Sequence, residues 1–359
     1  MIMSPSPSLQ ERYDQLKNMQ PKIRIRAAAN WLEVSELELL ELGLSQNVIR
    51  LNGDWKELLL ELEPLGKVMA LTRNQFAVHE RKGIYKNISF QGEGRMGVAV
   101  NEDIDLRFFM WEWEYAYAVQ MPRGNTNLYS LQFFNKHGEA VHKIYLTPFS
   151  NPTVYDKILK KYRAKNQHKI TKVLKRKPKP LAFRKNFKEA ASFQQEWLDL
   201  KDTHDFFGLL RKYELPRLQA LRLAPKDHAT PLQAEAIVRV FELMAKREIP
   251  IMIFVSSKGC IQIHTGPIKK LLPMDNWFNI MDPNFNLHLD TNGIGETWIT
   301  KKPTVDGHVT GIEVYDKEGA MILQCFGKRK PGKPELEEWR TVVDEVQTTF
   351  ALPLESMIN

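Results

Sequence analysis

Two segments of the chain repeat one pattern at a fixed spacing of 181 residues, and this repeat constrains the fold more than any other feature. The segment SLQFFNKHGEAVHKIYL at 130–146 matches GIEVYDKEGAMILQCFG at 311–327. In both, alternating apolar residues lead to an aromatic residue, Asn or Asp, Lys and then a glycine, and a second alternating run follows. This pattern predicts a β-hairpin whose turn needs positive φ at Gly138 in one copy and Gly319 in the other.

Other segments match at the same or nearly the same spacing. NEDIDLRFF at 101–109 matches DPNFNLHLD at 282–290, and VMALTRN at 68–74 matches IMIFVSS at 251–257. A helical stretch precedes both VMALTRN and IMIFVSS. Each copy therefore reads as helices followed by an antiparallel β-meander, which predicts an α+β fold. A repeat of domain size indicates a tandem duplication. Alternating strands leave one face that needs cover, so we expect the two large sheets to pack together.

Basic residues are concentrated between the two copies. The net charge is +8, yet the stretch from Lys157 to Lys188 holds 14 Lys and Arg and no acid, which leaves 51 − 14 = 37 basic against 43 acidic residues elsewhere. Its KPKP sequence cannot extend a helix and reads as a solvated linker. We therefore predict an N-terminal repeat over 1–150, a basic linker over 151–192 and a C-terminal repeat over 193–359.

Composition narrows the class of protein. The longest uncharged apolar run is IPIMIFVSS at 249–257 and no secretory leader opens the chain, so we expect a cytoplasmic protein without membrane insertion. Cys260 and Cys325 lie in strand-like contexts and read as buried thiols. The common catalytic signatures are absent from the sequence, so any activity must come from a bound group or an unfamiliar arrangement of residues.

His204 is the first candidate for chemistry, in KDTHDFFGLLRKYELPRLQALRLAP at 201–225. We expect a helix capped by Asp202 or Thr203, with His204 in its first turn. On a helical wheel the apolar face holds Phe206, Phe207, Leu209, Leu210 and Tyr213, and the other face holds His204, Gly208 and Arg211.

His204 is then either a solvent-facing residue or a ligand. Gly208 costs roughly 1 kcal/mol relative to alanine inside a helix, and it leaves a bare patch beside the imidazole where a flat ligand could lie. A neutral imidazole nitrogen is also the usual protein ligand for haem iron.

Other candidates have an ordinary structural interpretation as well. Arg107 should share a strand face with Asp105 and Phe109, and it either pairs with Asp105 or directs its N–H groups at a polar ligand. The aromatic run FFMWEWEYAYAV at 108–119 favours core packing over a base-stacking surface. Taken singly, Lys302, Gln324 and Arg329 read as surface residues and His79 as a structural or exposed histidine.

Six separated motifs, in matching order, resemble the bacterial haemin-degrading factor family, the HemS-like cytoplasmic haem-handling proteins. The motifs are THDFFGLLRKYELPRLQALRL, ALTRNQFAVHE, DLRFF, GCIQIHTGPIKKLLPMDNWFNIMDPNFNLHL, TWITKKPTVDGHVTGIEVYDKEG and QCFGKR. The resemblance runs from about residue 24 to residue 339 and leaves out the linker. It implies a tandem duplication with large antiparallel sheets stacked in the centre.

The resemblance also implies roles for single residues. His204 matches the proximal histidine that coordinates the iron, and Arg107 and Phe109 match an arginine and an aromatic residue on the distal side. Residues of the pocket near the propionates and the porphyrin rim are matched by Arg217, Lys302, Gln324 and Arg329. His79 matches a histidine proposed in part of the family to hold a second haem.

The expected function is that of a cytoplasmic haem-binding protein of bacterial haem uptake. It would carry haem, degrade it to release iron, or do both, and its partners would be a haem importer or a downstream haem oxygenase. Degradation of this haem-oxygenase-like but non-canonical kind needs an external electron donor. The alternative is a haem carrier or regulator without enzymatic activity, whose basic linker binds nucleic acid or an acidic partner in a salt-dependent manner.

Overall fold

The computed structural model describes residues 7–176, 183–329 and 332–354, which divide into two compact units. Unit 1 comprises Met1–Thr72, Lys82–Lys177 and Ser257–Ile261, and unit 2 comprises Arg73–Arg81, Pro178–Ser256 and Gln262–Asn359. The units do not coincide with the two copies of the sequence repeat. Strand β3 (Ala77–Gly83), from the first copy, belongs largely to unit 2, and β12 (Cys260–Gly266), from the second, begins in unit 1.

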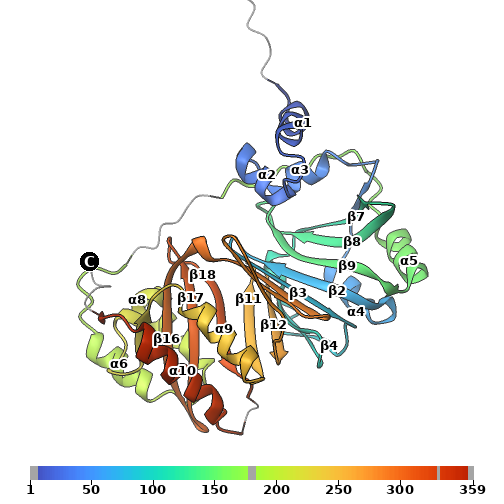
Figure 1. The fold of residues 1–359 in the computed structure, drawn as a ribbon. Coiled ribbons are helices and arrows are strands. Elements are labelled where there is room, and N and C mark those ends of the chain that lie inside the picture. The colour runs from blue at the N-terminus through green and yellow to red at the C-terminus, as the bar shows by residue number, and fades with distance from the viewer. Residues whose placement is uncertain (1–6, 177–182, 330–331, 355–359) are drawn as a thin grey trace, which may run out of the picture. The chain divides into compact units, whose positions relative to one another are not determined.

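Unit 1 consists of helices followed by an antiparallel meander (Figure 1). Its helices are α1 (Leu9–Met19), α2 (Ile25–Leu32), α3 (Glu36–Glu41), α4 (Trp55–Leu60) and α5 (Pro152–Tyr162), with short 3₁₀ turns η1 (Glu63–Leu65) and η2 (Met110–Glu112). Its strands are β1 (Val48–Leu51), β2 (Gly66–Arg73), β4 (Ile88–Gln91), β5 (Met96–Val100), β6 (Asp105–Phe109), β7 (Tyr115–Arg123), β8 (Thr126–Phe134) and β9 (Ala140–Ser150). They pair in the order β1-β7-β8-β9-β2, with β4-β5-β6 as a second run.

Unit 2 repeats this plan. Its helices are α6 (Ala190–Leu198), α7 (Asp205–Lys212), α8 (Arg217–Arg222), α9 (Ala236–Lys246) and α10 (Glu337–Phe350), with the 3₁₀ turn η3 (Thr291–Gly293). Its further strands are β10 (Ala229–Leu232), β11 (Ile251–Ser256), β13 (Leu271–Met274), β14 (Trp277–Met281), β15 (Phe285–Asp290), β16 (Ile294–Thr304), β17 (Gly307–Asp316) and β18 (Met321–Gly327). They pair antiparallel in the orders β10-β16-β17-β18-β11 and β3-β15-β14-β13.

The repeated strand order confirms the α+β class and the tandem duplication. Both predicted hairpins are present, and Gly138 and Gly319 have φ of 70° and 77°. The residue that starts each turn makes the same hydrogen bond with its side chain. Asn135 accepts the backbone N–H of His137 at 2.9 Å, and Asp316 accepts that of Glu318 at 3.0 Å. A side chain that hydrogen-bonds two residues ahead and a glycine at positive φ together stabilise such a turn.

Helices cover both faces of the β16–β18 sheet within unit 2. One face carries Ile299, Ile312 and Val314 and packs on α9 and α10, which lie along it in Figure 1. The opposite face carries Trp298 and Tyr315 and packs on α6, α7 and α8. Because side chains alternate along a strand, Thr300 and Lys302 share the face of Trp298. The stretch around His204 therefore lies on the side of the sheet that carries Lys302.

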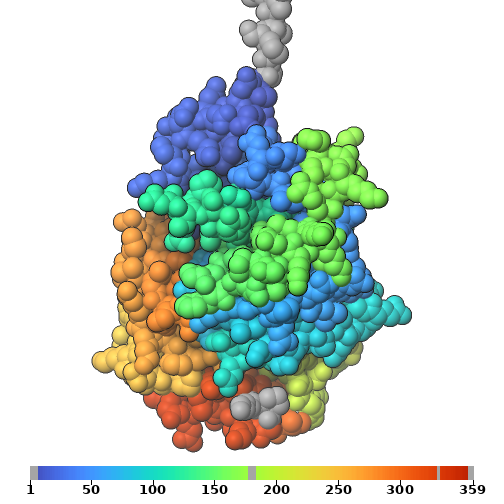
Figure 2. Space-filling view, turned by 90° about the vertical axis from the view of Figure 1, so that its right-hand side faces the viewer, coloured from blue at the N-terminus to red at the C-terminus, as the bar shows by residue number. Residues whose placement is uncertain are grey.

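The segment predicted as a basic linker, 151–192, contains ordered structure in its first half. Helix α5 begins at Pro152 and is capped by the Asn151 side chain. Beyond it the chain stays on the outer surface of unit 1 (green in Figure 2), where Gln167 bonds both backbone groups of Arg50 at 2.9 Å. Thr171 is buried and donates its backbone N–H to Glu41 at 2.8 Å. The KPKP stretch at 177–180 lies outside the described residues.

No helix in the described part of the chain is long and apolar enough to cross a membrane.

Candidate functional site

His204 lies immediately before α7, one or two positions earlier than predicted, so the prediction of Asp202 or Thr203 as the N-cap was wrong. It is itself the N-cap residue, because Asp202 folds the preceding turn: one Asp202 carboxylate oxygen accepts the backbone N–H of His204 at 2.8 Å. The same oxygen lies 2.6 Å from His204 Nδ1. The hydrogen bond from the His204 N–H is the main reason why the pKa of Asp202 is lowered. A carboxylate on Nδ1 holds the proton there and makes Nε2 the nitrogen with the lone pair.

The imidazole of His204 belongs to an exposed face of α7. Its side chain is 91% exposed. Phe206, Leu209, Leu210 and Tyr213 are buried as predicted, but Phe207 is 58% exposed, so its assignment to the apolar face was wrong. Residues three and four apart lie on one side of a helix, which places Phe207 and Gly208 beside His204. A Cβ atom added at Gly208 would meet nothing within 4 Å.

Arg217 and Lys302 meet at a buried carboxylate that the sequence did not single out. Glu313 on β17 accepts two hydrogen bonds from Arg217, Nε to Oε2 at 2.8 Å and Nη2 to Oε1 at 2.6 Å. Lys302 Nζ donates to Oε1 at 2.8 Å, and Tyr315 donates its hydroxyl to Oε2 at 2.6 Å. The Arg217 guanidinium also lies over Phe207, 5.5 Å from the ring centroid. Arg217, Lys302 and the α7 face are therefore parts of one region.

Opposing effects act on the charges of this cluster. Burial lowers the pKa of Lys302 to about 8, an effect that Glu313 opposes and Arg217 reinforces. Although burial favours the neutral acid, Arg217 and then Lys302 hold the pKa of Glu313 well below its usual value. Glu313 therefore stays ionised at neutral pH. The Lys302 side chain is only 4% exposed, so the interpretation of Lys302 taken singly as a surface residue was wrong.

Gln324 and Arg329 each hold a buried donor. Gln324 is directly opposite Glu313 in the β17–β18 register. Its Nε2 atom, and Nε of Arg329, are buried without a hydrogen-bond partner among the residues that the structure describes. Arg329 Nη2 forms an ion pair with Asp306 at 3.6 Å, and the charge of Arg329 also contributes to the lowered pKa of Asp202. Unsatisfied buried donors are costly, and a ligand with acceptor atoms would relieve the cost.

The two residues predicted on the distal side lie in unit 1. Arg107 shares the half-buried face of β6 with Asp105 and Phe109, as the alternation predicted. Arg107 Nη1 forms an ion pair with Asp105 and donates to the Leu106 carbonyl at 3.1 Å, which is the structural interpretation given above. Phe109 contacts Trp111, with ring centroids 5.2 Å apart.

His79 lies in the interior of unit 2. It is in β3, is 0% exposed, and its ring is 4.9 Å from that of Phe285. A haem at His79 would require β3 to move, so a second site there stays a prediction.

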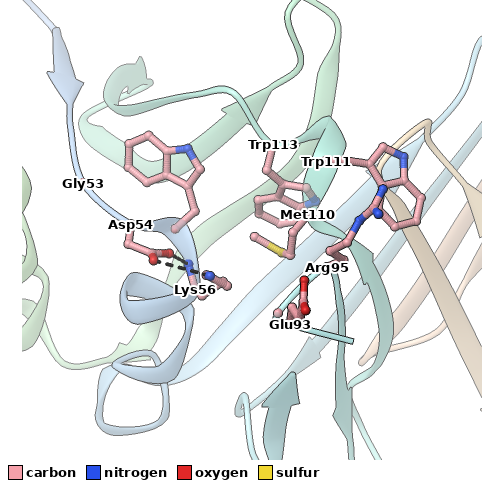
Figure 3. Close-up of a pocket in the computed structure, with 10 residues that line it drawn as sticks. Gly53, Asp54, Lys56, Glu93, Arg95, Met110, Trp111 and Trp113 are labelled. Carbon is pink, nitrogen blue, oxygen red and sulfur yellow. Dashed lines mark hydrogen bonds and ion pairs between the residues drawn. The ribbon is translucent and has the colours of Figure 1, made fainter. Parts of the chain in front are cut away.

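A hollow of about 570 Å³ opens on unit 1, and the residues that line it include none of the predicted site residues (Figure 3). Its walls come from the start of α4, the β4–β5 turn and η2, and Arg95 lies over the ring of Trp111 at 5.8 Å. Within the described ranges, no group of three or more His, Cys, Asp or Glu side chains could hold a metal ion.

Comparisons with known proteins agree over nearly the whole chain. The family model described as the haemin-degrading HemS.ChuX domain matches residues 33–162 and 214–346. The hemin transport protein HemS of Yersinia enterocolitica is 34% identical over 339 residues, which cover 93% of this chain and 96% of that protein.

Solved structures give the same result. Holo-PhuS, a haem-binding protein from Pseudomonas aeruginosa, is 41% identical with a TM-score of 0.88, over 95% of this chain and 97% of that one. The haem-degrading enzyme ChuS from Escherichia coli O157:H7 is 32% identical with a TM-score of 0.85, over 93% and 97% of the two chains. The protein therefore belongs to the haemin-degrading HemS/ChuX family.

Proposed function

We propose that this protein binds haem through His204 and either carries it or opens the ring to release iron, in the cytoplasm of a bacterium. The observation that carries the proposal is the exposed His204 imidazole, whose Nδ1 is held by Asp202 and whose neighbours are the exposed Phe207 and the bare Gly208. The names of the relatives support the ligand: HemS is a hemin transport protein, PhuS binds haem and ChuS degrades it.

The residues of the region suit haem in three ways. Nε2 of His204 has the lone pair that ferric or ferrous iron needs, and a carboxylate on the other nitrogen makes it a better donor. The flat ring needs apolar cover, which Phe207 and the open space at Gly208 offer. Ring carboxylates need cations and N–H donors, which Arg217, Gln324 and Arg329 supply.

In this proposal Arg107 and Phe109 serve the distal face. With His204 as the one strong protein ligand and an arginine in place of a second one, the iron would stay able to exchange or react. Arg107 would first have to loosen its ion pair with Asp105. When bound, haem supplies the iron at which oxygen chemistry takes place. Ring opening would also consume electrons from an external reductant, and a haem importer or a downstream haem oxygenase would be the partner for delivery.

Titration of the protein with haemin, followed at the Soret band, tests the binding site. The wild-type protein should give a saturable shift at one haem per chain, and His204→Ala should lose it because no axial nitrogen remains. The exposed His168 provides a matched control, since His168→Ala removes an accessible imidazole elsewhere in the chain. Haem binding through His204 is excluded if His204→Ala titrates like the wild-type protein.

Incubation of the haem complex with a reductant separates the two activities. Loss of the Soret band in air, but not under anaerobic conditions, would establish degradation that uses oxygen. A stable complex that passes haem to an acceptor protein would establish a carrier.

A further inference from the structure

The cluster around Glu313 in unit 2 has one more cation than anion among the described residues. Glu313 is fully buried and is contacted by Arg217 and Lys302, with Thr300 Oγ1 donating to it at 3.2 Å. Two ionised cations against one carboxylate leave a net charge of about +1. A buried net charge is costly unless a counter-charge reaches it.

The first copy of the repeat shows that this excess is not a requirement of the fold. Helix α8 (Arg217–Arg222) corresponds to α3 (Glu36–Glu41) at the spacing of 181 residues. Arg217 then corresponds to Glu36, and Gln324 to Lys143. In unit 1 Glu36 and Lys143 form an ion pair of one acid and one base.

The other positions of the cluster differ as well. Glu313 corresponds to Gln132, and Lys302 to Met121, at the same spacing. The paired strands agree with this match, since Gln132 is opposite Lys143 in β8–β9 as Glu313 is opposite Gln324 in β17–β18. The two-cation cluster is thus specific to the second copy, the copy that carries His204.

We propose that Glu313 is the positioning residue of a carboxylate-recognition cluster, in which Arg217 donates to one ionised side-chain carboxylate of the haem. The inference rests on the proposed function, which already assigns Arg217 to the ring carboxylates, and adds the residue that positions Arg217 for that contact. Glu313 holds the Nε and Nη2 side of the guanidinium, which has five N–H donors in a fixed plane. Orientation of that plane decides where the remaining donors point.

Lys302 acts through Glu313 in this scheme. Its side chain is 4% exposed, whereas that of Arg217 is 16% exposed, so Arg217 is the cation that a ligand reaches. The charged groups acting on Lys302 are Glu313 on β17, which also accepts the Tyr315 hydroxyl, and Arg217 on α8. The Lys302 charge offsets that of Glu313, and the charge of Arg217 therefore remains available to a carboxylate.

The test compares haem with haem dimethyl ester, which has no ionised carboxylates. Because a hydrogen bond to a charged group contributes about 1.5–3 kcal/mol, the wild-type protein should prefer haem by about tenfold or more in Kd. Glu313→Gln removes the anchor of Arg217, so the preference should fall to about twofold or less. Lys302→Met places the residue of the first copy in the cluster and should lower the preference similarly.

An ion pair at the other end of α8, between Arg222 and Glu296 of β16, provides a matched control. Glu296 is paired with Arg222 of α8 at 2.6 Å, so Glu296→Gln breaks an ion pair on α8 outside the cluster. It should leave the preference for haem over the ester unchanged. Circular dichroism and thermal unfolding of each variant monitor the fold, and Tyr315→Phe provides a milder change that removes one hydrogen bond to Glu313 and should lower the preference in part.

The outcomes separate this inference from the proposed function. Absence of haem binding by the wild-type protein would overturn both. Wild-type binding with a preference that stays the same in Glu313→Gln and Lys302→Met would overturn only the role of Glu313. An equal loss of affinity for haem and ester in these variants would show a structural role alone.

Discussion

Gly208 lowers the stability of its helix but leaves space for a ligand beside His204. It lies inside α7, and a Cβ there would meet nothing within 4 Å. Gly208→Ala should raise the free energy of unfolding by about 1 kcal/mol, because glycine is the poorer helix former. Gly208→Leu should also keep the fold. It should nevertheless weaken haem binding by about tenfold or more, because the side chain would occupy the space beside His204.

The measurements for this prediction are chemical unfolding and haemin titration of the same two variants. Gly208→Ala is the matched control for Gly208→Leu, since it changes the backbone preference but adds only a methyl group. Unchanged haem affinity in a folded Gly208→Leu would show that the ligand does not lie over Gly208.

At the residue scale, the sequence singled out His204 and Arg107 but assigned Phe207 to the wrong face and did not identify Glu313. Phe207 was placed on the buried face because a helical wheel does not show where the neighbouring helices end. Glu313 lies in a strand run that reads as ordinary alternation. Two of its five hydrogen bonds come from Arg217, 96 residues away, and the others come from its own strand and from the neighbouring strand β16, so only folding assembles the set.

At the element scale, the β8–β9 hairpin closes on the cap of a helix. A Cβ at Gly138 would lie 2.4 Å from Oγ of Ser35, the N-cap of α3. Gly124, in the β7–β8 turn, also has positive φ, at 58°, but has open space around it.

Both Gly138→Ala and Gly124→Ala should therefore destabilise the protein by the backbone cost of positive φ, roughly 1–2 kcal/mol. Gly138→Ala should cost more because the added methyl group displaces Ser35 and weakens the cap of α3, which contributes on the order of 1 kcal/mol. Urea unfolding of the two variants measures the difference. Equal losses of unfolding free energy in the two variants would mean that Ser35 can shift without weakening the cap of α3.

Helices α3 and α8 show what sequence comparison could have detected. They correspond residue for residue at the spacing that relates the hairpins, but acids at both ends of α3 are replaced by arginines at both ends of α8. The three apolar positions of α3 all have apolar counterparts in α8, but two six-residue helices are too short for this match to stand out in the sequence. The strands were easier to align because alternation and a turn glycine leave a stronger pattern.

At the scale of the whole molecule, each unit buries a neutral histidine. Burial lowers the pKa of His142 in unit 1 and of His264 in unit 2 to about 3. A lowered folded-state pKa means that the unfolded chain binds the proton first as pH falls. The contribution of each buried histidine to the free energy of unfolding is therefore present above pH ~6.5. It is lost toward pH 3, by up to about 1.4 kcal/mol per pH unit.

The free energy of unfolding should thus fall between pH 7 and pH 5, and His142→Gln should reduce the slope. Urea unfolding at a series of pH values measures it. His168→Gln, at an exposed histidine, is the control and should keep the wild-type slope. An unchanged slope in His142→Gln would show that His142 is not protonated on unfolding in this range.

The sequence by itself determined the α+β class, the duplication, the hairpins and the identity of the exposed histidine, because these depend on periodicity, turn chemistry and spacing along the chain. The tertiary structure alone decided which strands belong to each compact unit, that Phe207 lies beside His204, and that Arg217 and Lys302 converge on Glu313. The reason is physical. Charge balance in a buried cluster depends on contacts between different helices and strands, and periodicity along the sequence does not indicate which of these come into contact.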